Sequence, residues 1–267
     1  MDDVAKYNIE RWQMLAQANA IFTRPYLDLD KDSALNYLDP ERRLGDVAGK
    51  DVLCLAAGGG QQSVAFALLD ANVTVVDISE AQLQRDAEAA AHYKLKLNLF
   101  QGDMRDLSRF GDDMFDIVWQ PYSLNFVPDT RVVFREVAHV LRVGGIYHFN
   151  CANPFFIGLG QKDWNGAGYA LKLPYLDGVE IIYQDESWIY RGENPAEPTI
   201  ACKEYRHTLS TLVNGLVEQG YLVLNLSEQN LGPPNIKAEP GTSEHFTSIA
   251  PPWLIFWATY RPDILRK

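Results

Sequence analysis

The sequence is poor in cysteine, in positive charge and in long apolar runs, and each shortage argues against a class of protein. Its three cysteines are scattered and form no CxxC pair, so we expect neither a disulfide framework nor a zinc site. The formal net charge of -11 does not suit a protein that grips the phosphate backbone of nucleic acids. No apolar run reaches the roughly 18 residues of a membrane span, and the acidic, polar first residues do not form a signal peptide. These features predict a cytoplasmic protein with reduced thiols that binds neither nucleic acid nor a membrane.

Short apolar runs alternate with amphipathic stretches through the middle of the chain, whose 267 residues are 47% hydrophobic and allow a substantial core. Strands are expected at 51–56, 72–76, 96–101, 115–120 and 146–151, and helices at 61–69, 79–93 and 130–141. Ser79 is a good N-cap for the second helix, and Gly144 with Gly145 is expected to stop the third. Strands that alternate with helices are joined by crossovers, so the pattern predicts an α/β fold with a doubly wound, mostly parallel sheet.

The two ends of the chain and the segment after Cys151 follow a different pattern. Residues 1–25 are expected to be helical up to Pro25. The later segment, rich in proline, glycine and aromatics, predicts a lid-like insertion with some antiparallel strand. In the tail, a helix at 208–219 precedes strands at 221–228 and 252–260, which are expected to lack a helix between them and to pair antiparallel at a sheet edge. The predicted organisation is an N-terminal helical cap (1–49), a core (50–152), a lid or substrate insertion (153–206) and a C-terminal helix with a strand pair (207–267).

A glycine-rich turn follows the first expected strand, in the stretch CLAAGGGQQS at 54–63. Glycines let a ligand approach the backbone closely, and the N-terminus of the next helix offers unpaired N–H groups. Asp77 ends the second strand, where a carboxylate can accept hydrogen bonds from both hydroxyls of a ribose. Asp103 ends the third strand, where its carboxylate and the N–H of Met104 could pair with the edge of an adenine. The plainer alternatives are an empty glycine connection, a polar strand end and a helix cap, and together the three features favour a nucleotide site.

A nicotinamide-dependent dehydrogenase is one competing interpretation, because Gly58-x-Gly60-x-x-Ser63 loosely matches the dinucleotide fingerprint. Such an enzyme would show a second mononucleotide half with similar crossovers. The second half of this chain instead runs helix, strand, long loop and strand. The Gly-Asp pair after the third strand also has no use in the dinucleotide motif. These points weigh against an NAD(P)-dependent oxidoreductase.

Several motifs occur in an order and spacing that resembles the class I S-adenosylmethionine-dependent methyltransferases, in the branch with a methyltransferase type 11 core. The motifs are VLCLAAGGG (52–60), VDIS (76–79), GDM (102–104), FDIV (115–118) and LRVGG (141–145). The resemblance is strong over residues 50–151, and the C-terminal strand pair also fits it. It implies a Rossmann-like sheet of seven strands with an antiparallel C-terminal strand. It also implies the cofactor S-adenosyl-L-methionine and direct methyl transfer from its sulfonium to a small-molecule acceptor.

The resemblance implies a cofactor site made of turn residues, ribose and adenine contacts and one residue of the passage toward the acceptor. In chain order these are Ala56, Gly58, Gly60, Asp77, Ile78, Asp103, Met104 and Gln120. Asp77 would hold the ribose hydroxyls, Ile78 would pack on the adenine, and Gln120 would line the passage.

The sequence departs from the family pattern at two positions of the turn. Cys54 stands where the family usually has an acid, and Ala56 where it usually has glycine. A thiol in an apolar strand supplies no charge, because burial raises its pKa. Gln61 or the N-terminal arm at 7–12 is therefore expected to meet the cofactor's ammonium group. The same departures motivate the alternative of a catalytically silent module that binds S-adenosylmethionine or S-adenosylhomocysteine.

The acceptor side is predicted from single residues. His207 precedes the last crossover helix and could act as a general base, since imidazole titrates near neutral pH; a structural hydrogen bond is the equal alternative. Tyr122, after the fourth strand, is the second catalytic candidate. Weaker candidates for contacts with the substrate are Trp12, Tyr26, Asn125 and His245. Aromatics of the predicted lid, Trp188 among them, could wall an apolar pocket. The expected protein is a monomer or a homodimer.

Overall fold

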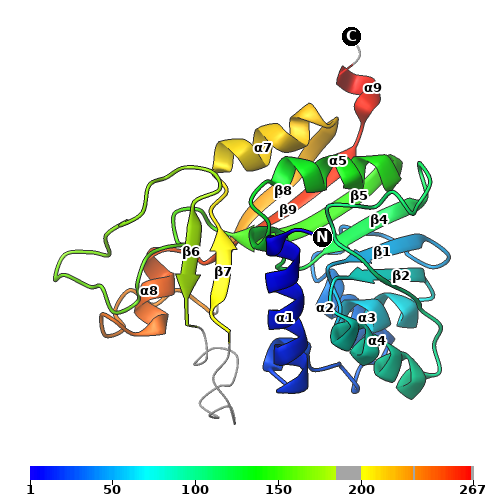
Figure 1. The fold of residues 1–267 in the computed structure, drawn as a ribbon, viewed down its shortest axis with the longest axis horizontal. Helices are drawn as coiled ribbons and strands as arrows, with labels where there is room; N and C mark the ends of the chain where they lie inside the picture. The colour runs from blue at the N-terminus through cyan, green and yellow to red at the C-terminus, as the bar shows by residue number, and fades with distance from the viewer. Residues whose placement is uncertain (185–199, 231, 266–267) are drawn as a thin grey trace.

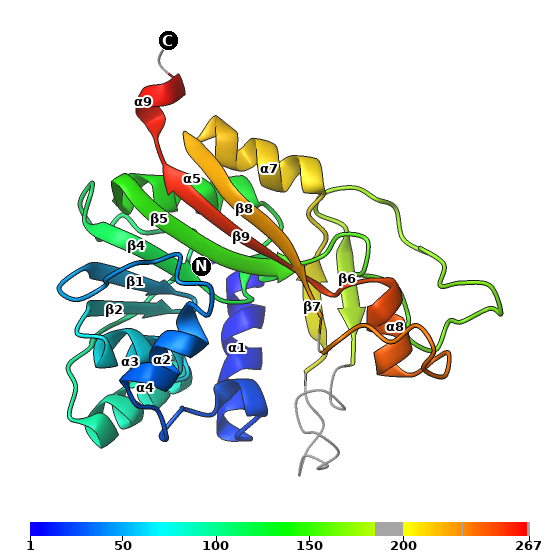
Figure 2. The same cartoon turned by 180° about the vertical axis from the view of Figure 1, so that it is seen from behind.

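The computed structural model describes residues 1–184, 200–230 and 232–265. Its centre is a seven-stranded sheet in the order β3-β2-β1-β4-β5-β9-β8, with helices on both faces (Figure 1, Figure 2). A second, two-stranded sheet of β6 and β7 stands beside it. The predicted doubly wound, mostly parallel sheet is confirmed.

Five parallel strands form one side of the main sheet. They are β1 (Asp51–Leu55), β2 (Asn72–Asp77), β3 (Asn98–Gln101), β4 (Phe115–Gln120) and β5 (Leu141–Ala152). The register places Cys54 of β1 between Val75 and Trp119, and both faces of β1 are buried, as is typical of a central parallel strand. Because these strands run in one direction, their carboxyl ends share one edge of the sheet, where ligands of such folds bind.

Helices α2 (Lys31–Leu38), α3 (Gln62–Leu68) and α4 (Glu80–Tyr93) pack on one face of the sheet. Helices α5 (Thr130–Val140) and α7 (Leu209–Glu218) pack on the other. Ser79 caps α4 as predicted, because its hydroxyl accepts a hydrogen bond from the N–H of Gln82. The predicted stop of α5 at Gly144 and Gly145 is wrong: the helix ends at Val140, and both glycines lie within β5. The register against β4 shifts there, and a Cβ on Gly145 would come within 3.0 Å of the Asp116 carbonyl oxygen.

The C-terminal strands β8 (Tyr221–Gln229) and β9 (Trp253–Tyr260) close the sheet. Strand β9 pairs antiparallel with both β5 and β8, so the predicted antiparallel pair at the sheet edge is confirmed. The expectation that no helix separates these strands is wrong. The short helix α8 (Ser243–Ile249) lies between them, begun by a hydrogen bond from the N–H of His245 to the hydroxyl of Thr242. Helix α9 (Pro262–Leu265) ends the described chain.

The N-terminal segment and the insertion stand at the carboxyl edge of the sheet. Helix α1 (Asp3–Gln17) and the short helix η1 (Ile21–Thr23) come from the first, and β6 (Glu180–Tyr183) with β7 (Cys202–Tyr205) from the second. Figure 1 shows α1 and the β6–β7 pair side by side at this edge, and the hydroxyl of Tyr7 donates a 2.7 Å hydrogen bond to the Ala201 carbonyl oxygen. The predicted lid residue Trp188 lies outside the described residues. None of the described helices has both the length and the apolar character that a membrane crossing needs.

Candidate functional site

A cavity of about 1050 Å³ opens at the carboxyl edge of the parallel strands. Its wall comes from the loops after β1, β2, β3 and β4, from α1 and η1, and from the β6–β7 pair. Among the residues that line it are Ala56, Gly58, Gln61, Asp77, Ile78, Asp103 and Met104. The fold therefore gathers most of the predicted cofactor residues around one space.

The glycine turn and Asp77 contact each other directly. The N–H of Gly58 donates to Oδ2 of Asp77 over 2.9 Å, and the N–H of Ser79 donates to Oδ1 over 2.9 Å. Burial raises the pKa of Asp77 to about 6, because desolvation disfavours a carboxylate. A Cβ on Gly58 would lie 2.6 Å from Cβ of Gln82 and 2.9 Å from the Asp77 carboxyl group. Only glycine fits this position without displacing the acid.

Ala56 occupies an unusual backbone conformation at the start of the turn. Its φ of 46° lies in the left-handed region, which costs an L-residue with a Cβ about 1–2 kcal/mol. The conformation lets its N–H donate to the Val76 carbonyl oxygen over 2.7 Å, so the turn stays attached to β2. Ala56 is therefore strained where a glycine would not be.

Asp86 of α4 holds the other half of the turn, and the sequence analysis missed it. Its carboxylate accepts hydrogen bonds from the N–H of Gly59 over 2.9 Å, from the N–H of Gly60 over 3.1 Å, and from the hydroxyl of Ser63. The side chain is fully buried, and this burial raises its pKa to about 7. A signal was available, because Asp86 shares the buried face of α4 with Leu83.

Gln61 connects the turn to the N-terminal segment. Its Nε2 donates to the carbonyl oxygens of Phe22 over 3.0 Å and Arg24 over 2.8 Å. The N–H of Tyr26 donates in turn to the Gly60 carbonyl oxygen over 2.9 Å. Both N–H groups of the Gln61 amide are thus directed away from a ligand, and its contribution to an ammonium group would come from Oε1 alone.

Asp103 lies on the cavity wall but is held by Arg105. The guanidinium of Arg105 contacts Oδ2 of Asp103 at 2.6 Å and also donates to both carboxylate oxygens of Asp2, over 2.7 and 2.9 Å. Asp2 is the N-cap of α1, and its contact with Arg105 holds the pKa of its carboxyl group well below the usual range. The helix-cap alternative for Asp103 does not apply, since no helix follows it directly and residues 104–105 and 108–109 form turns.

Gln120 and Gly60 were predicted to belong to the cofactor site and lie behind its wall. Gln120 is fully buried; its amide donates to Sδ of Met104 and to the hydroxyl of Ser123, and its Oε1 accepts from the hydroxyl of Tyr147. It therefore supports two residues that face the cavity instead of lining the passage itself. Gly60 packs against α4, where a Cβ would lie 2.8 Å from Cβ of Ala89.

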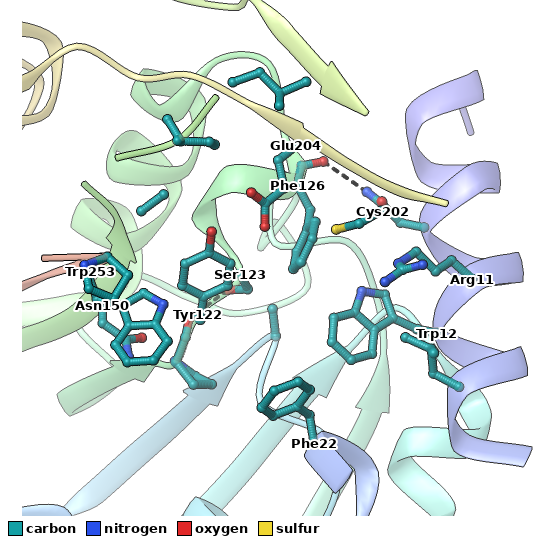
Figure 3. Close-up of a pocket in the computed structure, with 18 of the residues that line it drawn as sticks. Arg11, Trp12, Phe22, Tyr122, Ser123, Phe126, Asn150, Cys202, Glu204 and Trp253 are labelled. Atoms are coloured by element: carbon teal, nitrogen blue, oxygen red, sulfur yellow. Dashed lines mark hydrogen bonds between the residues drawn. The ribbon is translucent and has the colours of Figure 1, made fainter. Parts of the chain in front are cut away.

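The other end of the cavity is apolar and contains a tyrosine and a glutamate. Tyr122, Phe126 and Trp253 line it together with Glu204 of β7 (Figure 3). Burial, and then the neighbouring Glu204 carboxylate, raise the pKa of the Tyr122 hydroxyl well above its usual value. Figure 3 shows the Tyr122 hydroxyl and the Glu204 carboxylate directed into the same part of the cavity.

Glu204 is the second residue that the sequence analysis missed. Its side chain is 2% exposed, which is rare for a carboxylate. In the sequence CKEY of β7, Cys202 and Glu204 line the cavity while the residues that alternate with them point elsewhere. The period of two that marks a strand was the available signal, but four residues are too few to show it in the sequence alone.

Three predicted acceptor-side residues make structural contacts away from the cavity. Nε2 of His207 lies 3.2 Å from the Leu124 carbonyl oxygen, and burial lowers the pKa of this histidine to about 4. Asn125 bridges the Tyr205 carbonyl oxygen and the N–H of Ala152. Nδ1 of His245 lies 2.9 Å from the hydroxyl of Tyr169. The structural alternative for His207 is the better description of its contacts.

Two predicted aromatics do line the cavity. Trp12 of α1 meets Phe126 edge-on with ring centroids 5.5 Å apart, and Tyr26 meets Tyr37 at 5.1 Å. Figure 3 shows Trp12 and Arg11 reaching into the cavity from α1. The faces of such rings are favourable neighbours for a sulfonium cation.

The described residues fit a cofactor that contains a ribose. The observation that supports the fit is that Gly58 and Asp77 line the cavity together, in a contact so close that a Cβ on Gly58 would collide with the Asp77 carboxyl group. Within the described ranges, no group of three or more histidine, cysteine, aspartate and glutamate residues could hold a metal ion.

Comparisons with known proteins agree with this geometry. Residues 53–149 match the family profile described as a methyltransferase domain. An uncharacterized methyltransferase of Bacillus subtilis (strain 168) is 30% identical over 188 residues, which cover 70% of this chain and 71% of that protein. A demethylmenaquinone methyltransferase of Clavibacter sepedonicus is 36% identical over 104 residues, but these cover only 39% of this chain and 42% of that protein.

A solved structure shows the same fold. The crystal structure of an S-adenosylmethionine-dependent methyltransferase from Mesorhizobium loti superimposes with a TM-score of 0.62 and 23% identity, over 86% of this chain and 99% of that one.

Proposed function

Because this chain belongs to the S-adenosylmethionine-dependent methyltransferases, we propose that it methylates a small-molecule acceptor bound at the apolar end of its cavity. The observation that supports this proposal is the continuity of the site. One cavity has the glycine turn and Asp77 at one end and Tyr122, Trp253 and Glu204 at the other. Donor and acceptor would therefore share a single space.

Family membership makes S-adenosylmethionine the cofactor and leaves the dehydrogenase interpretation without support. In the proposed site Asp77 holds the ribose, while Gly58 allows the backbone to approach it. Asp103 and Met104 face the base. The cofactor supplies a methyl group already activated on a sulfonium, so the chain's own residues need to align the acceptor and exclude water.

The mechanism assigns a proton-accepting role to Glu204. An acceptor hydroxyl or amine loses a proton when its oxygen or nitrogen is methylated, and a carboxylate at the cavity wall can receive it. The Tyr122 hydroxyl keeps its proton because its pKa is raised, and Glu204 is its hydrogen-bond partner. Once Glu204 has taken up the acceptor's proton, this hydroxyl can donate its hydrogen bond to the acceptor and orient it. His207, whose ring lies behind the wall, takes no part.

The class of acceptor follows from the lining. Aromatic and aliphatic side chains dominate this end of the cavity, including Phe126, Phe156, Ile157 and Ile181. They suit an acceptor with a ring or another apolar body that carries one O–H or N–H group. A relative named for the methylation of demethylmenaquinone is consistent with this class.

Two measurements test the proposal. Calorimetry with S-adenosylhomocysteine should show saturable binding, and Asp77→Ala should weaken it at least about ten-fold, because a hydrogen-bonding charge is lost. The matched control is Asp106→Ala, which removes an exposed carboxylate that accepts hydrogen bonds from the nearby Ser108. A folded protein that does not bind the ligand at millimolar concentration would contradict the proposal.

The acceptor is sought with labelled methyl groups. S-adenosylmethionine carrying a labelled methyl is incubated with the protein and with a metabolite extract separated by polarity. We expect the label to enter the apolar, low-molecular-weight fractions. Label found only in macromolecules would contradict a small-molecule acceptor.

A further inference from the structure

A buried carboxylate lies beneath the glycine turn but outside the cavity. Three donors converge on Asp86: the N–H groups of Gly59 and Gly60 and the hydroxyl of Ser63. The two glycines have φ values of 124° and 72°, which residues with a Cβ rarely adopt. Their N–H groups therefore point back toward α4 only while the turn keeps this unusual shape.

The ionised carboxyl group of Asp86 offers these donors two oxygens and no hydrogen. A carboxylate has only acceptor positions, whereas an asparagine has one acceptor oxygen and an NH₂ group. An amide at position 86 would replace one carboxylate oxygen by an NH₂ group, whose hydrogens would face the donors that this oxygen now accepts from. The turn would lose hydrogen bonds or shift, because a buried donor left unpaired is unfavourable.

Strand β1 offers no charge from its side of the turn. Cys54 is fully buried, and burial, followed by the nearby Asp86 carboxylate, raises its thiol pKa well above the usual value. The two side chains therefore approach the same region, one from β1 and one from α4. A carboxylate from either element could reach it, but two together would repel.

We propose that Asp86 is the positioning residue of the cofactor site, supplying from α4 the carboxylate that the sequence lacks at position 54 of β1. It acts through the backbone. Asp77 fixes the N–H of Gly58, Asp86 fixes the next two N–H groups, and the cofactor meets a turn that is already shaped. This inference rests on the cofactor site of the proposed function and is independent of the acceptor.

Paired variants on the same helix test the role. At about pH 8, above the pKa of about 7 to which burial raises Asp86, Asp86→Asn removes the charge beneath the turn. Glu88→Gln removes an exposed charge two residues away, on a carboxylate that contacts Arg85 and Gln84. Calorimetry with S-adenosylhomocysteine should show about ten-fold or greater weakening for Asp86→Asn and no change for Glu88→Gln. Circular dichroism confirms that both samples are folded at the titration temperature. Equal affinities in the two folded variants would overturn the inference.

Moving the carboxylate from position 86 to position 54 separates a positioning role from a merely structural one, because it should restore affinity for the cofactor. Cys54→Asp alone should weaken binding, because two carboxylates then meet in one buried region. Cys54→Asp combined with Asp86→Ala should bind more tightly than either single variant, since one carboxylate is restored beneath the turn. A folded double variant that binds no better than Asp86→Ala would overturn the inference. Absence of binding by the unchanged protein would instead contradict the proposed function.

Discussion

Arg105 and Asp2 are joined by two hydrogen bonds of 2.7 and 2.9 Å, although 103 residues separate them in the sequence. Asp2 begins α1, and Arg105 also contacts Asp103 on the cavity wall. The start of the N-terminal helix is thus attached to the rim of the cofactor site.

We expect Arg105→Ala to loosen α1 with only a small loss of global stability, up to about 1 kcal/mol, because the pair is partly exposed. Limited proteolysis should cut the first residues sooner, and S-adenosylhomocysteine should dissociate faster. Arg109→Ala is the matched control, since Arg109 lies over the Phe100 ring in the same loop region. Equal cleavage rates in the two variants would contradict the attachment.

Relieving the strain at Ala56 should stabilise the protein. Ala56→Gly removes a Cβ from a left-handed conformation, and we expect a gain of up to about 1 kcal/mol in the free energy of unfolding, reduced by the greater freedom of glycine in the unfolded chain. Urea denaturation measures it. Ala57→Gly, at a buried neighbour without positive φ, should destabilise instead. A lower free energy of unfolding for Ala56→Gly than for Ala57→Gly would contradict the strain at Ala56.

Gly58→Ala should weaken cofactor binding strongly and lower the stability of the fold much less. The new Cβ would overlap Cβ of Gln82 and push the Asp77 carboxylate away. Titration with S-adenosylhomocysteine is expected to show at least a hundred-fold weakening, on the order of the about 3 kcal/mol attached to a charged hydrogen bond. Gly111→Ala, where the nearest atom is 3.9 Å away, provides the control and should bind normally.

Four buried groups make opposing contributions to the pH dependence of stability. Burial raises the pKa of Asp77 to about 6 and of Asp86 to about 7, so between pH 4.5 and 6 the native state holds protons that the unfolded chain has lost. Burial lowers the pKa of His148 to about 3 and of His207 to about 4, so the unfolded chain holds protons that the native state lacks. The two effects nearly cancel, and these groups should give a flat profile in this range.

Single substitutions should tilt that profile in opposite directions. Asp86→Asn removes one native proton, so the free energy of unfolding should rise by about 1.4 kcal/mol per pH unit. His207→Gln removes one proton from the unfolded chain, so it should fall by the same amount as pH rises. Urea denaturation at several pH values between 4.5 and 6 measures both slopes. Slopes of the same sign would contradict the assignment.

Glu204→Gln should separate chemistry from cofactor binding. We expect the methyl-transfer rate to fall by about 10²–10⁴-fold, the usual contribution of a general base, while the affinity for S-adenosylhomocysteine stays within two-fold. Glu180→Gln is the control, because Glu180 of β6 forms an ion pair with Lys203 of the same small sheet. This variant should retain activity. An unchanged rate in Glu204→Gln would remove its catalytic role.

The sequence was sufficient where strand order alone decides position. Asp77 ends β2 and Asp103 follows the end of the neighbouring parallel strand β3. Their place at one edge of the sheet therefore follows from the alternation of strands and helices. His207 was a candidate base because it follows the insertion in the sequence, and a structural hydrogen bond was the equal alternative. Its ring lies behind the wall near Leu124. Nearness along the chain is a weak guide to which side of a wall a side chain occupies.

Only weak sequence signals pointed to Asp86 and Glu204. Asp86 meets the turn because α4 packs beneath it with this face inward. The sequence alone favours the opposite, since a charged residue on a helix is usually solvated. Glu204 lies on a four-residue strand that pairs with β6, so its inward direction depends on how the small sheet sits against α1.

The contacts of Gln61 connect the border of the cavity to the glycine turn. The segment at Phe22 and Arg24 forms part of the cavity's border. Gln61, whose amide holds this segment, is also the N-cap residue of α3, the helix after the glycine turn. Moving that segment aside would break both hydrogen bonds of the Gln61 amide while leaving those of Asp77 and Asp86 to the turn in place. For the proposed cofactor, the border of the site could therefore open without the loss of the turn that binds it.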